Sequence, residues 1–143
     1  MRGIAKALMA YETSSNKSSG VKASAVFYVA AKLRPHLANL MGIGGFRALL
    51  SRALVLANAE VSWLREVHVN LDGTLDGLEK AHVQVDQPEF LKGSVVLLAH
   101  LLGLLVAFIG LNLTLRQINE IWPKLSPTIW AVAGEEVQHE KAK

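Results

Sequence analysis

The sequence of 143 residues contains no cysteine, only four prolines and 19% charged residues. The absence of cysteine excludes a disulfide-stabilised scaffold, a thiolate metal site and a cysteine nucleophile. The charged fraction lies below the value of about 25% that is usual for soluble domains, which excludes a chain kept disordered by high charge. Apolar residues, in contrast, make up 51% of the sequence. The length fits one domain, so we expect a single folded unit with much apolar surface to bury.

Sequence motifs of catalysis are also missing. The chain has no P-loop, no dinucleotide-binding fingerprint and no nucleophile elbow. No two of its five histidines are three or four residues apart, the spacing at which a helix presents two metal ligands on one side. We therefore expect a protein that is not an enzyme, with no catalytic residues, no cofactor and no metal site.

Charge is unevenly distributed along the chain. Residues 1–58 carry eight Lys or Arg residues and one acid, Glu12, whereas residues 59–143 carry seven bases and eleven acids. The basic half suits anionic lipid, nucleic acid or the acidic half of the same chain as a partner, and we favour the last because the bases are dispersed. We do not expect nucleic acid as a partner, because no run of bases alternates with aromatic side chains.

The residue pattern divides the chain into three parts. Residues 1–20 contain a short predicted helix, with Ile4, Leu8 and Met9 on one side, followed by a polar linker rich in serine. Residues 21–125 form the predicted helical bundle domain. Residues 126–143 form a charged C-terminal tail.

The bundle domain opens with two amphipathic helices, predicted over residues 21–41 and 45–69. A glycine-rich turn at residues 42–45 separates them. Pro35 predicts a kink or a break near Arg34 in the first of the two helices.

The segment that follows these helices is less regular. Two Asp-Gly pairs, at residues 72–73 and 76–77, predict turns. Apolar and polar residues alternate at residues 67–69 and again at 83–85. This alternation favours a short β-hairpin between the second and the third helix of the bundle.

The third helix is predicted from Pro88 to Pro123, about 34 residues and about 51 Å long if it is continuous. Its residues 93–115 carry no charge. An uncharged run of this length is a candidate membrane span, although the purely apolar part, residues 95–111, lies at the short limit. Bases flank both ends in equal number, so the positive-inside rule assigns no orientation.

A stripe of small or weakly polar residues runs along this third helix. Its spacing lies near 3.5 residues, which suits a partner helix alongside, and small residues let a second helix backbone approach closely. The alternative is that common residues fall at this spacing by chance. The stripe predicts an interface made of Gly93, His100, Gly103, Ala107, Gly110 and Thr114.

One carboxylate, Glu60, lies within the apolar stripe of the helix predicted over residues 45–69. If that helix packs antiparallel to the third helix, Glu60 meets His100. The two would then form a buried polar pair, which fixes register rather than performing chemistry. The alternative is that each side chain reaches water at the rim of the core.

The apolar content of the third helix decides the fold and the function that we expect. Leaving half of its large apolar side chains in water would forfeit on the order of 10–20 kcal/mol, more than the stability of a typical domain. The other helices each offer only one apolar stripe. We therefore expect an all-α helical bundle around one long hydrophobic helix, with a second copy, another protein or lipid covering the remainder.

Two functions are compatible with such a helix. The first is a cytoplasmic, non-enzymatic interaction or scaffolding protein that self-associates through the helix, with a homo-oligomer or a helical protein as the partner. The alternative is a membrane-inserting or single-pass membrane-associated protein, whose basic half lies on anionic lipid.

Three segments resemble small bacterial proteins of unassigned function. They read LRPHL at residues 33–37, GGFRALL at residues 44–50 and LLGLLV at residues 101–106. The resemblance implies a bacterial cytoplasmic setting, and it carries no activity and no site residue.

Overall fold

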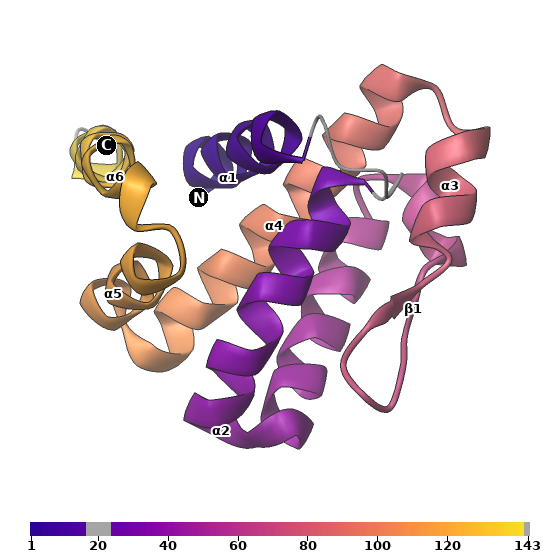
Figure 1. Cartoon of the computed structure of the whole chain (residues 1–143), viewed down its shortest axis with the longest axis horizontal. Helices are drawn as coiled ribbons and strands as arrows, with labels where there is room; N and C mark the ends of the chain where they lie inside the picture. The colour runs from indigo at the N-terminus through magenta and orange to yellow at the C-terminus, as the bar shows by residue number, and fades with distance from the viewer. Residues whose placement is uncertain (17–23, 142–143) are drawn as a thin grey trace.

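The computed structural model describes residues 1–16 and 24–141 of the chain (Figure 1). This part consists of α-helices with short 3₁₀ helices and one two-stranded sheet, which confirms the predicted all-α helical bundle with a short β-hairpin. The elements are α1 (Arg2–Ser15), α2 (Ala25–Asn58), η1 (Ser62–Glu66), β1 (His68–Val69), β2 (Leu75–Asp76), α3 (Leu78–Gln84), α4 (Gln87–Ile109), α5 (Leu111–Ile121), η2 (Pro123–Leu125) and α6 (Ser126–Lys141). Residues 17–20 of the predicted polar linker lie outside the described residues.

Helix α2 is two helical arms joined at Gly42. The backbone of Gly42 has φ 78° and ψ 159°, a conformation that glycine adopts readily and other residues do not. Pro35 lies inside the first arm. The backbone around it stays helical, because Gly42 is the only residue of α2 with non-helical dihedral angles. The predicted break near Arg34 is therefore wrong. Pro35 and Ala31, whose carbonyl group loses its hydrogen bond to the proline, are both exposed, so water can bind that carbonyl.

The second arm of α2 ends at Asn58, eleven residues before the predicted end. The chain continues as the 3₁₀ helix η1, and Val61, Leu64 and Val67 remain buried. Their spacing of three residues fits a 3₁₀ helix, which has three residues per turn, as well as it fits one side of an α-helix. The sequence pattern therefore predicted the burial of these side chains correctly and the type of helix wrongly.

The hairpin pairs β1 with β2 in antiparallel register, with His68 opposite Asp76. The predicted second strand, residues 83–85, is wrong, because most of it belongs to α3 and its flank. The first Asp-Gly pair closes the hairpin, with Gly73 at φ 83°. The second pair places Gly77 at φ 94° immediately before α3. The first pair thus forms the turn of the hairpin, and the second leads from β2 into α3.

The predicted continuous third helix is also wrong, since it breaks at Gly110. Gly110 has φ 89° and ψ 159°, and the chain turns there so that α5 packs against α4 and α2. Helix α4 alone has 23 residues, about 34 Å at 1.5 Å per residue. Half of the apolar window of α4 is buried within the chain. The break shortens the rod that the other helices have to cover.

The core lies where α1 and α2 pack against α4, with α6 on the side of α1 away from α2 (Figure 1). The predicted apolar side of α1, including Ile4 and Leu8, is fully buried. Residues 126–141, which we expected within the charged tail, form α6. Ile129 of α6 is fully buried, and α6 contacts α1 and α5.

Candidate functional site

The predicted interface stripe begins at a glycine that packs inside the protein. A Cβ atom added to Gly93 would lie 2.6 Å from Cε2 of Trp63, closer than two carbon atoms can approach. The indole of Trp63 stacks on the ring of Phe90, with centroids 5.0 Å apart, and its Nε1 donates to the carbonyl of Glu89 at 3.0 Å. Gly93 is therefore a small residue because Trp63 of the same chain covers it.

The middle of the stripe, in contrast, is uncovered. A Cβ atom added to Gly103 would have no heavy atom within 4 Å, and Ala107 is exposed. Phe108 is 67% exposed, and Leu104 is only partly buried. These four residues fall on one side of α4, since they are separated by one, three and four positions. We name Gly103, Leu104, Ala107 and Phe108 the open face of α4.

The end of the stripe lies at the corner between α4 and α5. Gly110 is exposed and forms the break. Thr114 is buried in α5, and its hydroxyl donates to the carbonyl of Gly110 at 2.8 Å. Because the chain changes direction at Gly110, Thr114 does not extend the open face. Five of the six residues of the predicted interface thus divide into a covered end, an open middle and a corner, and the sixth, His100, contacts Glu60.

Glu60 and His100 are in contact, as predicted for the case in which their two helices pack against each other. Nε2 of His100 is 2.6 Å from Oε2 of Glu60, and the guanidinium of Arg2 donates to Oε1 of Glu60 at 2.6 Å. Both members of the pair are partly exposed, with 40% of the Glu60 side chain and 30% of the His100 side chain open to solvent. The contact therefore lies at the rim of the core rather than inside it.

The pKa of Glu60 is lowered from its ordinary value by the hydrogen bond with His100 first and the one with Arg2 second. The chain positions these groups from three elements. Arg2 begins α1, Glu60 follows the end of α2, and His100 lies in the middle of α4. This arrangement links α1 and α4 to the end of α2 electrostatically, with one partner on each oxygen of the carboxylate.

A second carboxylate, Glu12, is fully buried, which the sequence analysis did not predict. Its Oε2 accepts from Nζ of Lys32 at 2.6 Å and from Nε1 of Trp122 at 2.8 Å, and its Oε1 accepts from Nδ2 of Asn16 at 2.9 Å. One signal could have identified it: Glu12 follows Leu8 by four residues, on the apolar side of the first helix. The four groups join α1 to α2 and to the end of α5, so their role is structural.

Two findings bear on membranes and metals. Among the described residues, α2 and α4 are long and apolar enough to cross a membrane, and their apolar windows are 28% and 50% buried. Within residues 1–16 and 24–134, no three His, Asp or Glu side chains gather where they could hold a metal ion.

Comparisons of the chain with protein-family models, with curated proteins and with solved structures find no match.

Proposed function

We propose that this protein is a non-enzymatic helical interaction protein that self-associates through the open face of α4. The observation that carries the proposal is the exposure of Phe108, at 67%, beside Gly103, which has free space around it. A large apolar side chain and an empty position on the same side of one helix are complementary when two copies meet. We place this activity in the cytoplasm, as the resemblance to small bacterial proteins implies.

The open face is complementary to itself in an antiparallel arrangement. In a pair of α4 helices with its two-fold axis between Leu105 and Val106, Phe108 of each copy lies opposite Gly103 of the other. Leu104 then lies opposite Ala107. Each large side chain meets a small one, which lets the two backbones approach closely.

The exposed area sets the strength that we expect. A phenylalanine buries about 150–250 Å² when it is fully covered, so covering the exposed two thirds of Phe108 stabilises the pair by roughly 2.5–4 kcal/mol per copy. Association itself costs about 4–15 kcal/mol. The two phenylalanines together exceed the lower end of this cost by at most about 4 kcal/mol, which supports a weak dimer with a Kd of about 1 mM.

Light scattering coupled to size exclusion tests the proposal in buffer without detergent. Over a dilution series the average mass of the wild-type chain should rise with concentration from one copy toward two. Phe108→Asp places a charge in the contact and Gly103→Leu fills the empty position, so both variants should remain monomeric. The matched control is Val83→Asp, which alters an exposed apolar side chain on α3, outside the open face.

A second candidate function, association with a membrane, is favoured by the length and apolar character of α2 and α4. It receives less support, because half of the apolar window of α4 is already covered by the chain and insertion would have to expose that core. Co-sedimentation with vesicles that contain anionic lipid discriminates between the two. Recovery of the wild-type chain with the vesicles at low salt supports the membrane, and recovery in the supernatant as a dimer supports self-association.

A further inference from the structure

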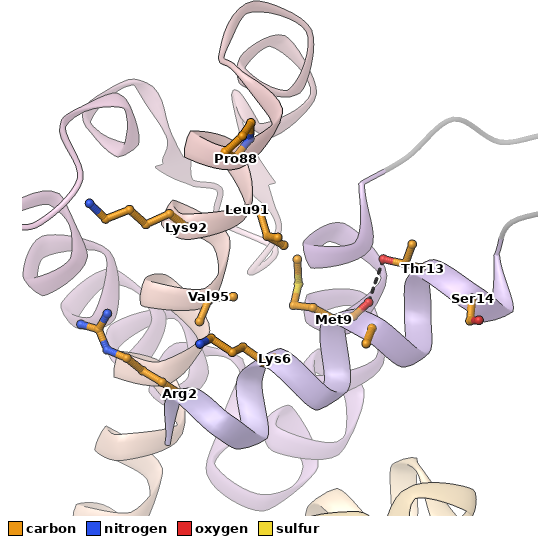
Figure 2. A pocket seen from close by; sticks show the side chains of 10 residues that line it. Arg2, Lys6, Met9, Thr13, Ser14, Pro88, Leu91, Lys92 and Val95 are labelled. Atoms are coloured by element: carbon orange, nitrogen blue, oxygen red, sulfur yellow. Dashed lines mark hydrogen bonds between the residues drawn. The ribbon is translucent and has the colours of Figure 1, made fainter.

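Helices α1 and α4 enclose a groove of about 660 Å³, which is separate from the open face of α4 (Figure 2). From α1 it is lined at positions 2, 6, 9, 10, 13 and 14, and from α4 at positions 88, 91, 92 and 95. Both sets have the spacing of one side of a helix. The volume lies within the range of about 300–1,000 Å³ that small-molecule sites occupy.

The charges that line this α1–α4 groove all have one sign. Arg2, Lys6 and Lys92 line it, and none of the lining residues is acidic. Arg2 is engaged by Glu60, whereas Lys6 and Lys92 have no acidic partner within the part of the chain that the structure describes. Figure 2 shows the three cationic groups at the same end of the groove. That end therefore favours an anion.

The rest of the groove is apolar. Met9 and Val95 form its buried floor, and Leu91, which is 49% exposed, and Ala10 lie above the floor. The side chains of Met9 and Leu91 point toward one another across the groove (Figure 2). An exposed leucine beside a recessed apolar floor leaves a surface that an apolar chain covers favourably.

We propose that the α1–α4 groove binds one molecule of an anionic amphiphile, a compound with an unbranched apolar chain and a carboxylate or phosphate end. The anionic end lies between Lys6 and Lys92, and the apolar chain lies over Met9 and Leu91. A flat bilayer surface fits less well, because the floor is recessed between two helices and only a single chain reaches it.

Calorimetric titration of the full chain tests the site with dodecanoate and dodecyl phosphate, both kept below the concentrations at which they form micelles. Both should bind with one molecule per chain. Acetate supplies the head without the chain, and dodecyltrimethylammonium supplies the chain with the opposite charge. Each of these should bind at least tenfold more weakly, because each lacks one half of the recognition.

Variants locate the binding on the protein. Lys6→Gln combined with Lys92→Gln should weaken dodecanoate binding roughly fivefold to tenfold, as expected for two exposed charge pairs. The matched control, Lys80→Gln combined with Lys124→Gln, removes two exposed lysines outside the groove and should leave the affinity unchanged. Ala10→Trp fills the groove from an exposed position of α1 and should abolish binding of both amphiphiles.

Three results would overturn the proposal. Equal affinity for dodecyltrimethylammonium would show that the charge of the groove plays no part. Unchanged affinity in the Lys6 and Lys92 double variant and in Ala10→Trp would place the binding elsewhere. Binding to anionic phospholipid vesicles without binding to either monomeric amphiphile would assign the surface to a membrane instead.

Discussion

Two glycines of α4 have opposite surroundings, so the same substitution should change stability in opposite directions. At Gly93 the added methyl group meets the indole of Trp63, at 2.6 Å from Cε2. At Gly103 it meets nothing within 4 Å. Both positions are helical, so both gain the same conformational advantage of alanine over glycine, about 0.5–1 kcal/mol. Only the contacts differ.

The contacts set the size of the effect. In Gly93→Ala the indole of Trp63 has to move, which costs about 1–3 kcal/mol for overpacking. The movement also disturbs the stacking on Phe90 and the hydrogen bond to Glu89, and the hydrogen bond alone contributes about 0.5–1.5 kcal/mol. After the gain in helix propensity, we expect Gly93→Ala to lower the free energy of unfolding by about 1–3 kcal/mol. We expect Gly103→Ala to raise it by about 0.5–1 kcal/mol.

Urea denaturation followed by far-ultraviolet circular dichroism measures both values, because the signal reports the helices that unfold. The experiment is run at a low protein concentration, so that self-association does not contribute to the stability of either variant. A stability of Gly93→Ala equal to or above that of the wild type would contradict the clash with Trp63. A destabilised Gly103→Ala would contradict the free space at Gly103.

Three further changes test other parts of the structure. Because the pKa of Glu60 lies below its ordinary 4.5, the ionised carboxylate stabilises the fold above about pH 4.5 and this contribution is lost as the pH falls through the folded-state value. The unfolding free energy of the wild type should therefore fall between about pH 5 and pH 3. That of Glu60→Gln should fall less over the same interval, because this variant has no carboxylate to protonate. Glu12→Gln removes the charge that accepts from Lys32 and Trp122 and should cost about 1.5–3 kcal/mol in urea denaturation, whereas an unchanged midpoint would contradict a structural role. Gly110→Ala forces a side chain into a positive φ of 89° and should lower the thermal midpoint through a strain of about 1–3 kcal/mol, a loss that Gly103→Ala should not show.

The positions of the helices follow from the sequence more closely than their ends do. The apolar pattern runs without interruption across Gly103 and Gly110, yet the first is helical and the second breaks the helix. The residue type and the periodicity are the same at the two sites, so neither can distinguish them. The difference arises from tertiary packing, because the turn at Gly110 allows α5 to cover α4. In the same way, the spacing of Val61, Leu64 and Val67 fixes which side chains are buried without fixing the helix type.

Some contacts of the candidate site could likewise be predicted from the sequence, and others could not. The contact between Glu60 and His100 could be anticipated, because both polar groups lie in apolar stretches of two predicted helices that follow one another in the sequence. The partners of Glu12 could not, since Trp122 is 110 residues away in the sequence. The open face could be predicted only in part. Its small residues are visible in the pattern, but whether Trp63 covers Gly93 or Gly103 depends on where α2 ends and η1 begins.

Self-association is tested by the mass of the wild-type chain, measured by light scattering in detergent-free buffer as the concentration is raised. Self-association through the open face predicts a concentration-dependent rise from the mass of one copy toward that of two, which Phe108→Asp abolishes and Val83→Asp preserves. A wild-type chain that stays at the mass of one copy up to millimolar concentration would contradict self-association through the open face of α4.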